Sequence, residues 1–239
     1  MPAPYLILLI PIISAMFVVA GWGDELTGGR FPFRACVSVS CAVILWLMSA
    51  QEIRKTICWV IAALVISSVA DWFMMNAAML VSNVSDKSMM NSGRVLAYFL
   101  CGICLFFTAH IGFLVFCLKN GRIAHWLLLP VLTGYLAFFF LVLYPAISNS
   151  VLLVAVLAYL LISCISLAAA AGLRLFPIAR WNFTVGIALI VFSDTIIALS
   201  VFAGYGKLDF LILPTYFACH VMITFALMTV KPSKTARLQ

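Results

Sequence analysis

Charge is scarce in this sequence. Only 9% of its 239 residues are Asp, Glu, Lys or Arg, and 66% are hydrophobic, whereas a soluble domain has about 25% charged residues. The polar stretches between the apolar runs are short, and no long linker or low-complexity segment separates them. These absences exclude a soluble domain. They predict an all-α polytopic membrane protein with a single domain over residues 1–239, whose net charge of +7 does not indicate nucleic-acid binding.

Basic residues are also missing from the first apolar run, residues 1–23, which has no clear small-residue cleavage site. A signal peptide would have both features, so we expect a first membrane-spanning helix here. Because a span needs about 20 mostly apolar residues, the sequence predicts a bundle of eight transmembrane helices. Their expected ranges are 4–22, 33–50, 56–80, 94–118, 127–145, 150–172, 182–203 and 211–230.

The distribution of basic residues predicts the orientation of these spans. Eight spans would place both termini on one side of the membrane, and the loops and tail on that side contain nine of the 14 Lys and Arg residues. The opposite loops, in which we include Arg34, contain the other five. By the positive-inside rule both termini are therefore expected to be cytoplasmic. In a bacterium, the protein would lie in the inner membrane.

Two aspartates lie deep within predicted spans, where an ionised carboxylate is costly. Asp71 is in the third span and Asp194 in the seventh, and both spans run outwards. Each aspartate is slightly past the midpoint of its span, so one site could contain both. No Lys or Arg is expected within the spans to pair with them. Intramembrane ionisable groups commonly mark function, although a hydrogen bond between helices is the structural alternative.

Two histidines follow the aspartates in a similar pattern. His110 occurs in "FTAHI" and His220 in "FACHV", each on the span after an aspartate. The repeated order suggests a parallel repeat of four plus four helices as a hypothesis, and we expect both histidines to line the cavity of the aspartates. Other polar residues at similar depth are candidates for substrate binding or support. They are Asn76, Tyr98, Ser193 and Tyr216.

No pattern typical of a metal or redox centre stands out. The sequence has no H-x-x-x-H or H-E-x-x-H spacing, and the C-x-x-C pair at Cys101 and Cys104 lies in an apolar run where a thiol is unreactive. We therefore expect neither a metal nor another cofactor.

The residues around these candidates resemble the YhhN family of lysoplasmalogenases. The likeness covers residues 56–228 and is carried by "VADWFMM", "LCGICLFFTAHIGF", "VGIALIVFSDTIIAL" and "YFACHVMI". The resemblance implies hydrolysis of the vinyl-ether bond of a lysophospholipid to a fatty aldehyde and a glycerophospho-alcohol. It also implies that Asp71 and Asp194 are catalytic. Membrane lipids are expected to surround the protein.

Two carboxyl groups suit this chemistry, since a vinyl ether hydrolyses after protonation of its β-carbon. One carboxylic acid would supply the proton, and one carboxylate would stabilise the oxocarbenium ion, as in glycosidases. The sequence does not decide which aspartate is the acid. A proton-coupled transporter that uses the Asp and His residues as a relay is the alternative function.

Overall fold

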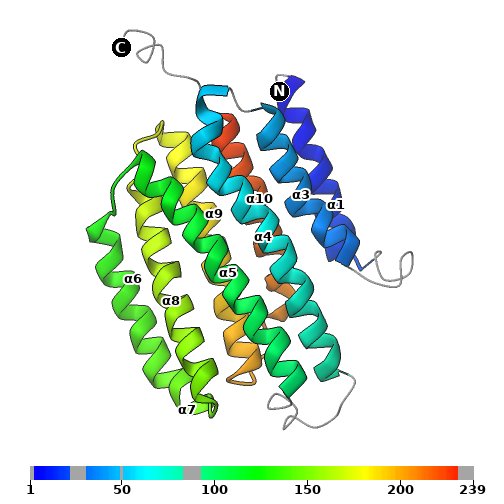
Figure 1. Cartoon of the computed structure of the whole chain (residues 1–239), viewed down its shortest axis with the longest axis vertical. Coiled ribbons are helices and arrows are strands. Elements are labelled where there is room, and N and C mark those ends of the chain that lie inside the picture. Colours follow the sequence, from blue (N-terminus) through cyan, green and yellow to red (C-terminus); the bar gives the residue numbers. More distant parts are fainter. Residues whose placement is uncertain (1–2, 22–30, 49–50, 83–92, 231–239) are drawn as a thin grey trace.

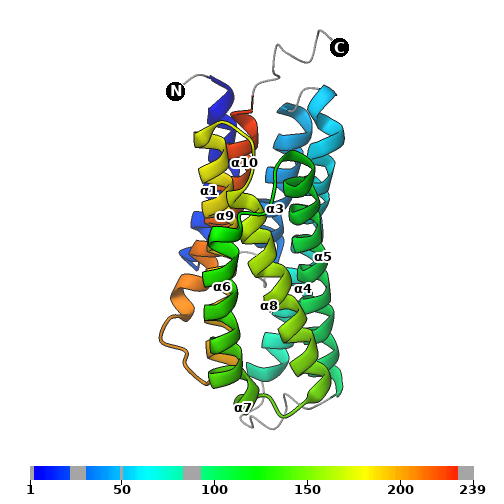
Figure 2. The same ribbon diagram turned by 90° about the vertical axis from the view of Figure 1, so that its left-hand side faces the viewer.

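The computed structural model describes residues 3–21, 31–48, 51–82 and 93–230, and these residues contain helices and no strand. The helices run side by side along the long axis of the molecule (Figures 1 and 2). In chain order the elements are η1 (Ala3–Leu8), α1 (Leu9–Val19), α3 (Phe31–Met48), α4 (Gln51–Ser82), α5 (Gly93–Asn120), α6 (His125–Phe138), the π-helix η3 (Phe139–Leu143), α7 (Tyr144–Ala146), α8 (Ser150–Ala171), α9 (Pro177–Val201), η4 (Asp209–Leu211) and α10 (Ile212–Met228).

The helices confirm the prediction of an all-helical membrane protein. Six of them are long and apolar enough to cross a bilayer, and many large apolar side chains face outwards, such as Leu141, Phe176 and Leu129. The six are Thr56–Met79, Gly93–Asn120, His125–Ala146, Ser150–Ala171, Pro177–Val201 and Asp209–Met228. Two shorter apolar helices, Tyr5–Val19 and Pro32–Met48, precede them. The count of eight spans therefore stays a prediction.

The first and last described helices approach the same end of the bundle. The start of η1 and the end of α10 lie at the top of Figure 1, whereas α7 lies at the opposite end. The helices α1 and α3 extend along only part of the length of α4. Which end faces the cytoplasm stays a prediction.

Each aspartate-bearing helix packs along a histidine-bearing helix. The most extensive helix contacts join α4 to α5 and α9 to α10. Gly112 allows the first pair to approach closely, because a Cβ atom there would lie 2.8 Å from the carbonyl oxygen of Trp59. Small residues at a helix interface permit this kind of close approach in membranes. The pairing fixes Asp71 and Asp194 on well-packed helices, while the sequence repeat itself stays a hypothesis.

Candidate functional site

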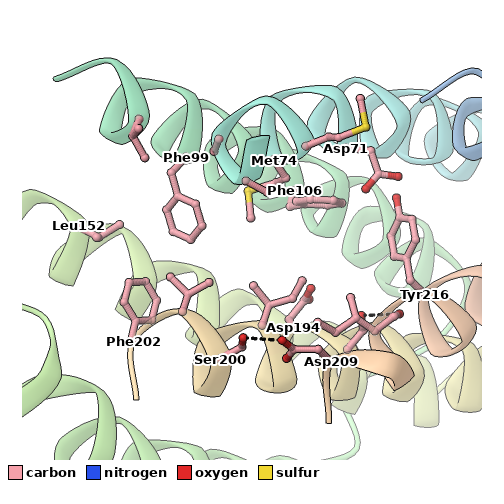
Figure 3. Close-up of a pocket in the computed structure, with 18 of the residues that line it drawn as sticks. Asp71, Met74, Phe99, Phe106, Leu152, Asp194, Ser200, Phe202, Asp209 and Tyr216 are labelled. Carbon is pink, nitrogen blue, oxygen red and sulfur yellow. Dashed lines mark hydrogen bonds between the residues drawn. The ribbon is translucent and has the colours of Figure 1, made fainter. Parts of the chain in front are cut away.

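Asp71 and Asp194 line one cavity of about 860 Å³. Asp71 lies 8 residues before the end of the apolar helix Thr56–Met79, and Asp194 lies 7 residues before the end of Pro177–Val201. The cavity lies between α4 and α5 on one side and α9 and α10 on the other (Figure 3). The structure thus brings together the two aspartates, as their matched depth suggested, and their catalytic role stays a prediction.

The cavity has a polar part and an apolar part. Phe99, Leu152 and Phe202 lie together at one end, and Asp71 and Tyr216 lie at the other (Figure 3). Asp194 lies between these two groups (Figure 3). A largely apolar cavity with a few convergent polar groups is typical of a site for an apolar ligand.

Tyr159 of α8 is bound to Asp194, although no pattern in the sequence singles it out. The Tyr159 hydroxyl donates a hydrogen bond of 2.5 Å to Oδ2 of Asp194. This length is typical of a bond from a hydroxyl to an ionised carboxylate. Both residues also line a second, smaller cavity of about 60 Å³ behind Asp194. The only sequence signal was a tyrosine in the middle of an apolar run, which does not separate it from a packing residue.

Asp71 has fewer partners than Asp194. Its side chain is 7% exposed, and its Oδ2 atom is buried without a hydrogen-bond partner among the described residues. The Tyr216 hydroxyl points towards the Asp71 carboxyl (Figure 3) and donates a bond of 3.4 Å to the carbonyl oxygen of Ser67. Tyr216 therefore lies where the sequence analysis expected it, and it ties α10 to α4 at the site.

Arg34 corrects the expectation that no basic residue faces the aspartates. It is the fourth residue of α3 and lines the cavity with Asp71 and Asp194. The helix begins at Phe31 because Pro32 is accepted in a first turn, so the residue assigned to a loop lies within a helix. The charge of Arg34 acts on Asp71, and its Nε atom is buried without a hydrogen-bond partner among the described residues.

Neither histidine is among the cavity-lining residues, which corrects the expectation that they line it. Both are buried behind tyrosines. His220 has its Nδ1 atom 2.8 Å from the carbonyl oxygen of Tyr216, and the two ring centroids are 4.5 Å apart. The ring of His110 packs edge-on against Tyr159, at 5.4 Å between centroids. Each histidine thus supports a tyrosine whose hydroxyl faces one of the aspartates. A five-residue motif does not reveal which face of a helix meets a cavity.

The remaining candidates divide between the cavity and other surfaces. Ser193 lines the cavity, and its Oγ donates to the carbonyl oxygen of Ile212 at 3.1 Å. Asn76 instead donates to the carbonyl oxygen of Trp72 at 2.7 Å, and the Tyr98 ring packs against Trp72 at 6.0 Å between centroids. Neither Asn76 nor Tyr98 is among the lining residues, so the structure does not bring these two to the aspartates.

The described residues contain no group of three His, Cys, Asp or Glu side chains placed to bind a metal ion. That the protein works without a metal or another cofactor stays a prediction.

The comparison with known proteins identifies the family. Neither a curated protein nor a solved structure matches the chain. The model of the YhhN family, by contrast, matches residues 29–227. This range includes both aspartates and Arg34, Tyr159 and Tyr216, and it confirms the resemblance found in the sequence. The chain belongs to the YhhN family.

Proposed function

We propose that the protein hydrolyses the vinyl-ether bond of a lysophospholipid within the membrane. Membership of the YhhN family is consistent with a membrane hydrolase. The observation that carries the proposal is the convergence of Asp71 and Asp194, from helices far apart in sequence, on one largely apolar cavity. Its volume of about 860 Å³ is large enough for a ligand of lipid size, since pockets for small molecules commonly have about 300–1,000 Å³.

Two carboxyl groups supply what the reaction needs. One, as the acid, transfers its proton to the β-carbon of the vinyl ether, and the other, as the anion, stabilises the oxocarbenium ion that forms. Water then adds to the cationic carbon and loses a proton to a carboxylate. The resulting hemiacetal collapses to a fatty aldehyde and a glycerophospho-alcohol, which consumes one water molecule and leaves both carboxyl groups as they began.

The contacts of each aspartate bear on the two roles. Asp194 accepts the short bond from Tyr159, and a carboxylate with such a donor is suited to remain the anion. Asp71 has a buried oxygen without a partner among the described residues, so no hydrogen-bond donor holds that oxygen in its ionised form. The charge of Arg34 acts on Asp71 as well and favours its ionised form, so each aspartate has a contact that suits the anion.

The cavity also suits the shape of the substrate. A lysophospholipid has one long apolar chain, which the end formed by Phe99, Leu152 and Phe202 can receive. The vinyl ether lies where this chain meets the polar headgroup. In this orientation the scissile bond would lie near Asp194 and Asp71.

Purified protein in detergent, incubated with lysoplasmalogen and assayed for released aldehyde, tests the proposal. Wild-type protein should release aldehyde, and Asp71→Asn and Asp194→Asn should each abolish release, because Asn retains the volume of Asp but provides neither a proton nor a negative charge. Aldehyde released in detergent would also argue against a function as a transporter alone. Transport can be detected only across the membrane of a sealed compartment.

Asp209→Asn is the matched control. Asp209 lies at the exposed edge of the cavity and accepts a hydrogen bond of 3.0 Å from Ser200. The same substitution there should retain most of the activity. Normal turnover by a folded Asp71→Asn or Asp194→Asn protein would remove that aspartate from the mechanism.

A further inference from the structure

Arg34 is the only Lys or Arg among the described residues that line the cavity. Its side chain is half-buried, and its Nε atom is shielded from solvent without a hydrogen-bond partner in the described part of the chain. A buried polar atom of this kind normally has a partner. Because Arg34 also lines the cavity, its guanidinium has donors for a ligand there that accepts hydrogen bonds.

The charge of the cavity narrows the chemistry of that ligand. Three carboxyl groups line the cavity, at Asp71, Asp194 and Asp209. These carboxyl groups, when ionised, would repel an anionic ligand group, whereas the guanidinium of Arg34 would attract it. A guanidinium has donors in a planar fork that matches the oxygens of a phosphate.

The position of Arg34 fits a substrate that presents its phosphate close to the reacting bond. Arg34 and Asp71 line the same cavity, and the charge of Arg34 acts on Asp71. In a lysophospholipid only the three carbons of glycerol separate the ether oxygen from the phosphate ester oxygen. A phosphate bound at Arg34 would therefore place the ether bond beside Asp71, with the apolar chain directed towards Phe99 and Phe202.

We infer that Arg34 binds the phosphate of the lysophospholipid headgroup and thereby selects phosphate-bearing lipids over neutral ether lipids. The inference rests on the proposed function, because it names the part of the proposed substrate that this residue recognises. Arg34 is a specificity residue in this scheme, and the proton transfer itself belongs to the aspartates.

A binding experiment tests the inference without any turnover. The probes are a saturated alkyl-ether lysophosphocholine, which lacks the vinyl group and cannot react, and the matching alkylglycerol, which lacks the phosphate. Affinity for purified protein in detergent can be measured by thermophoresis. Wild-type protein should bind the phosphate-bearing lipid at least tenfold more tightly, since a charge-assisted hydrogen bond commonly contributes about tenfold or more.

Substitutions at Arg34 should remove this preference. Arg34→Gln should bind both lipids equally, with the affinity for the alkylglycerol unchanged, which also shows that the cavity is intact. Arg34→Lys should retain part of the preference, because lysine keeps the positive charge but lacks the planar pair of hydrogen-bond donors. Arg180→Gln is the matched control: Arg180 is also half-buried with an orphaned Nε, but it is not among the lining residues. It should behave like wild type.

Kinetics separate this role from an effect on Asp71. With lysoplasmalogen, Arg34→Gln should raise KM at least tenfold, and with the phosphate-free alkenylglycerol its KM should stay as in wild type. An equal loss on both substrates would instead make Arg34 a partner of Asp71 and overturn the inference. So would an undiminished lipid preference in Arg34→Gln, or no preference in wild type. If wild type shows the binding preference but releases no aldehyde, the proposed reaction fails and the phosphate site stands.

Discussion

At the scale of single residues, the two aspartates differ in what surrounds them. Asp194 accepts a hydrogen bond from the Tyr159 hydroxyl, and His110 packs against the Tyr159 ring. Asp71 faces the Tyr216 hydroxyl and the charge of Arg34. Pairs of carboxyl groups in unlike environments can divide the roles of acid and anion between them. In the proposed reaction, Tyr159 is therefore a positioning residue that acts through Asp194.

Replacing Tyr159 by Phe should lower kcat by about tenfold or more and leave KM nearly unchanged. Removing one donor to a charged acceptor commonly costs about 1.5–3 kcal/mol, and here the loss would fall on Asp194, one of the two carboxyl groups of the proposed reaction. Because Asp194 would lose its hydrogen-bond donor, the pH profile of kcat should also change shape. Steady-state kinetics over a range of pH would measure both effects.

Tyr135→Phe is the control for that experiment. Tyr135 lines the same small cavity, but its hydroxyl bonds to Thr195, at 2.8 Å. Its loss should leave the pH profile as in wild type. An identical profile in Tyr159→Phe and Tyr135→Phe would show that Tyr159 has a structural role only.

The reaction run in D₂O tests the chemical step. Protonation of the β-carbon by a carboxylic acid places one solvent-derived deuterium on the carbon next to the aldehyde group. Mass spectrometry should detect this deuterium in excess of the slow exchange seen when the aldehyde is incubated alone. The rate should also fall at high pH, as the acid loses its proton. Aldehyde without the deuterium would rule out an acid role for either aspartate.

Part of this site could be predicted from the sequence. Asp71 and Asp194 were evident because a carboxylate in an apolar run is conspicuous, and Tyr216 followed from its depth. Tyr159 and Arg34 could not be found in the same way. A tyrosine within a span is common as a packing residue, and an arginine beside Gly- and Asp-rich sequence is typical of a loop. Whether His110 meets the cavity depends on the rotation of α5, which periodicity in a uniformly apolar helix does not define.

At the scale of helices, the ranges predicted from apolar runs correspond to the observed helices, because length and composition are sufficient to mark them. The pairing of α4 with α5 could not be predicted with the same ease. It depends on close contacts at a few small residues, and Gly112 is the one whose Cβ position is occupied by backbone atoms of Trp59 and by Ala63.

Gly112→Ala should therefore destabilise the protein. The new methyl group would lie 2.8 Å from the Trp59 carbonyl oxygen, which belongs to the backbone and cannot turn away. Overpacking of this kind costs about 1–3 kcal/mol, so the midpoint of thermal unfolding in detergent should fall. Gly134→Ala in α6 is the control, because nothing lies within 4 Å of its Cβ position. It should be neutral or stabilising by up to about 1 kcal/mol. A Gly112→Ala protein as stable as wild type would mean that α4 and α5 are less closely packed.

At the scale of the whole molecule, the cavity extends to one end of the bundle. Its lining includes Ala146, the last residue of α7, and Ser148 and Asn149 from the connection between α7 and α8. This connection lies at the end opposite to the start of η1 and the end of α10 (Figure 1). If both termini are cytoplasmic, as the charge distribution predicts, the substrate reaches the aspartates from the outer face of the membrane.

Spheroplasts of a bacterial host that expresses the protein can test this sidedness. A green fluorescent protein fused to the C-terminus should fluoresce, and a phosphatase fused there should be inactive, since the positive-inside rule places that end in the cytoplasm. Lysoplasmalogen added outside intact spheroplasts should then be hydrolysed without permeabilisation, and the water-soluble glycerophospho-alcohol should appear in the medium. Spheroplasts with the Asp194→Asn protein are the control for hydrolysis by host enzymes. Activity that appears only after permeabilisation, with the C-terminus shown to be cytoplasmic, would place the entrance of the cavity on the inner face and contradict the orientation deduced from Ala146, Ser148 and Asn149.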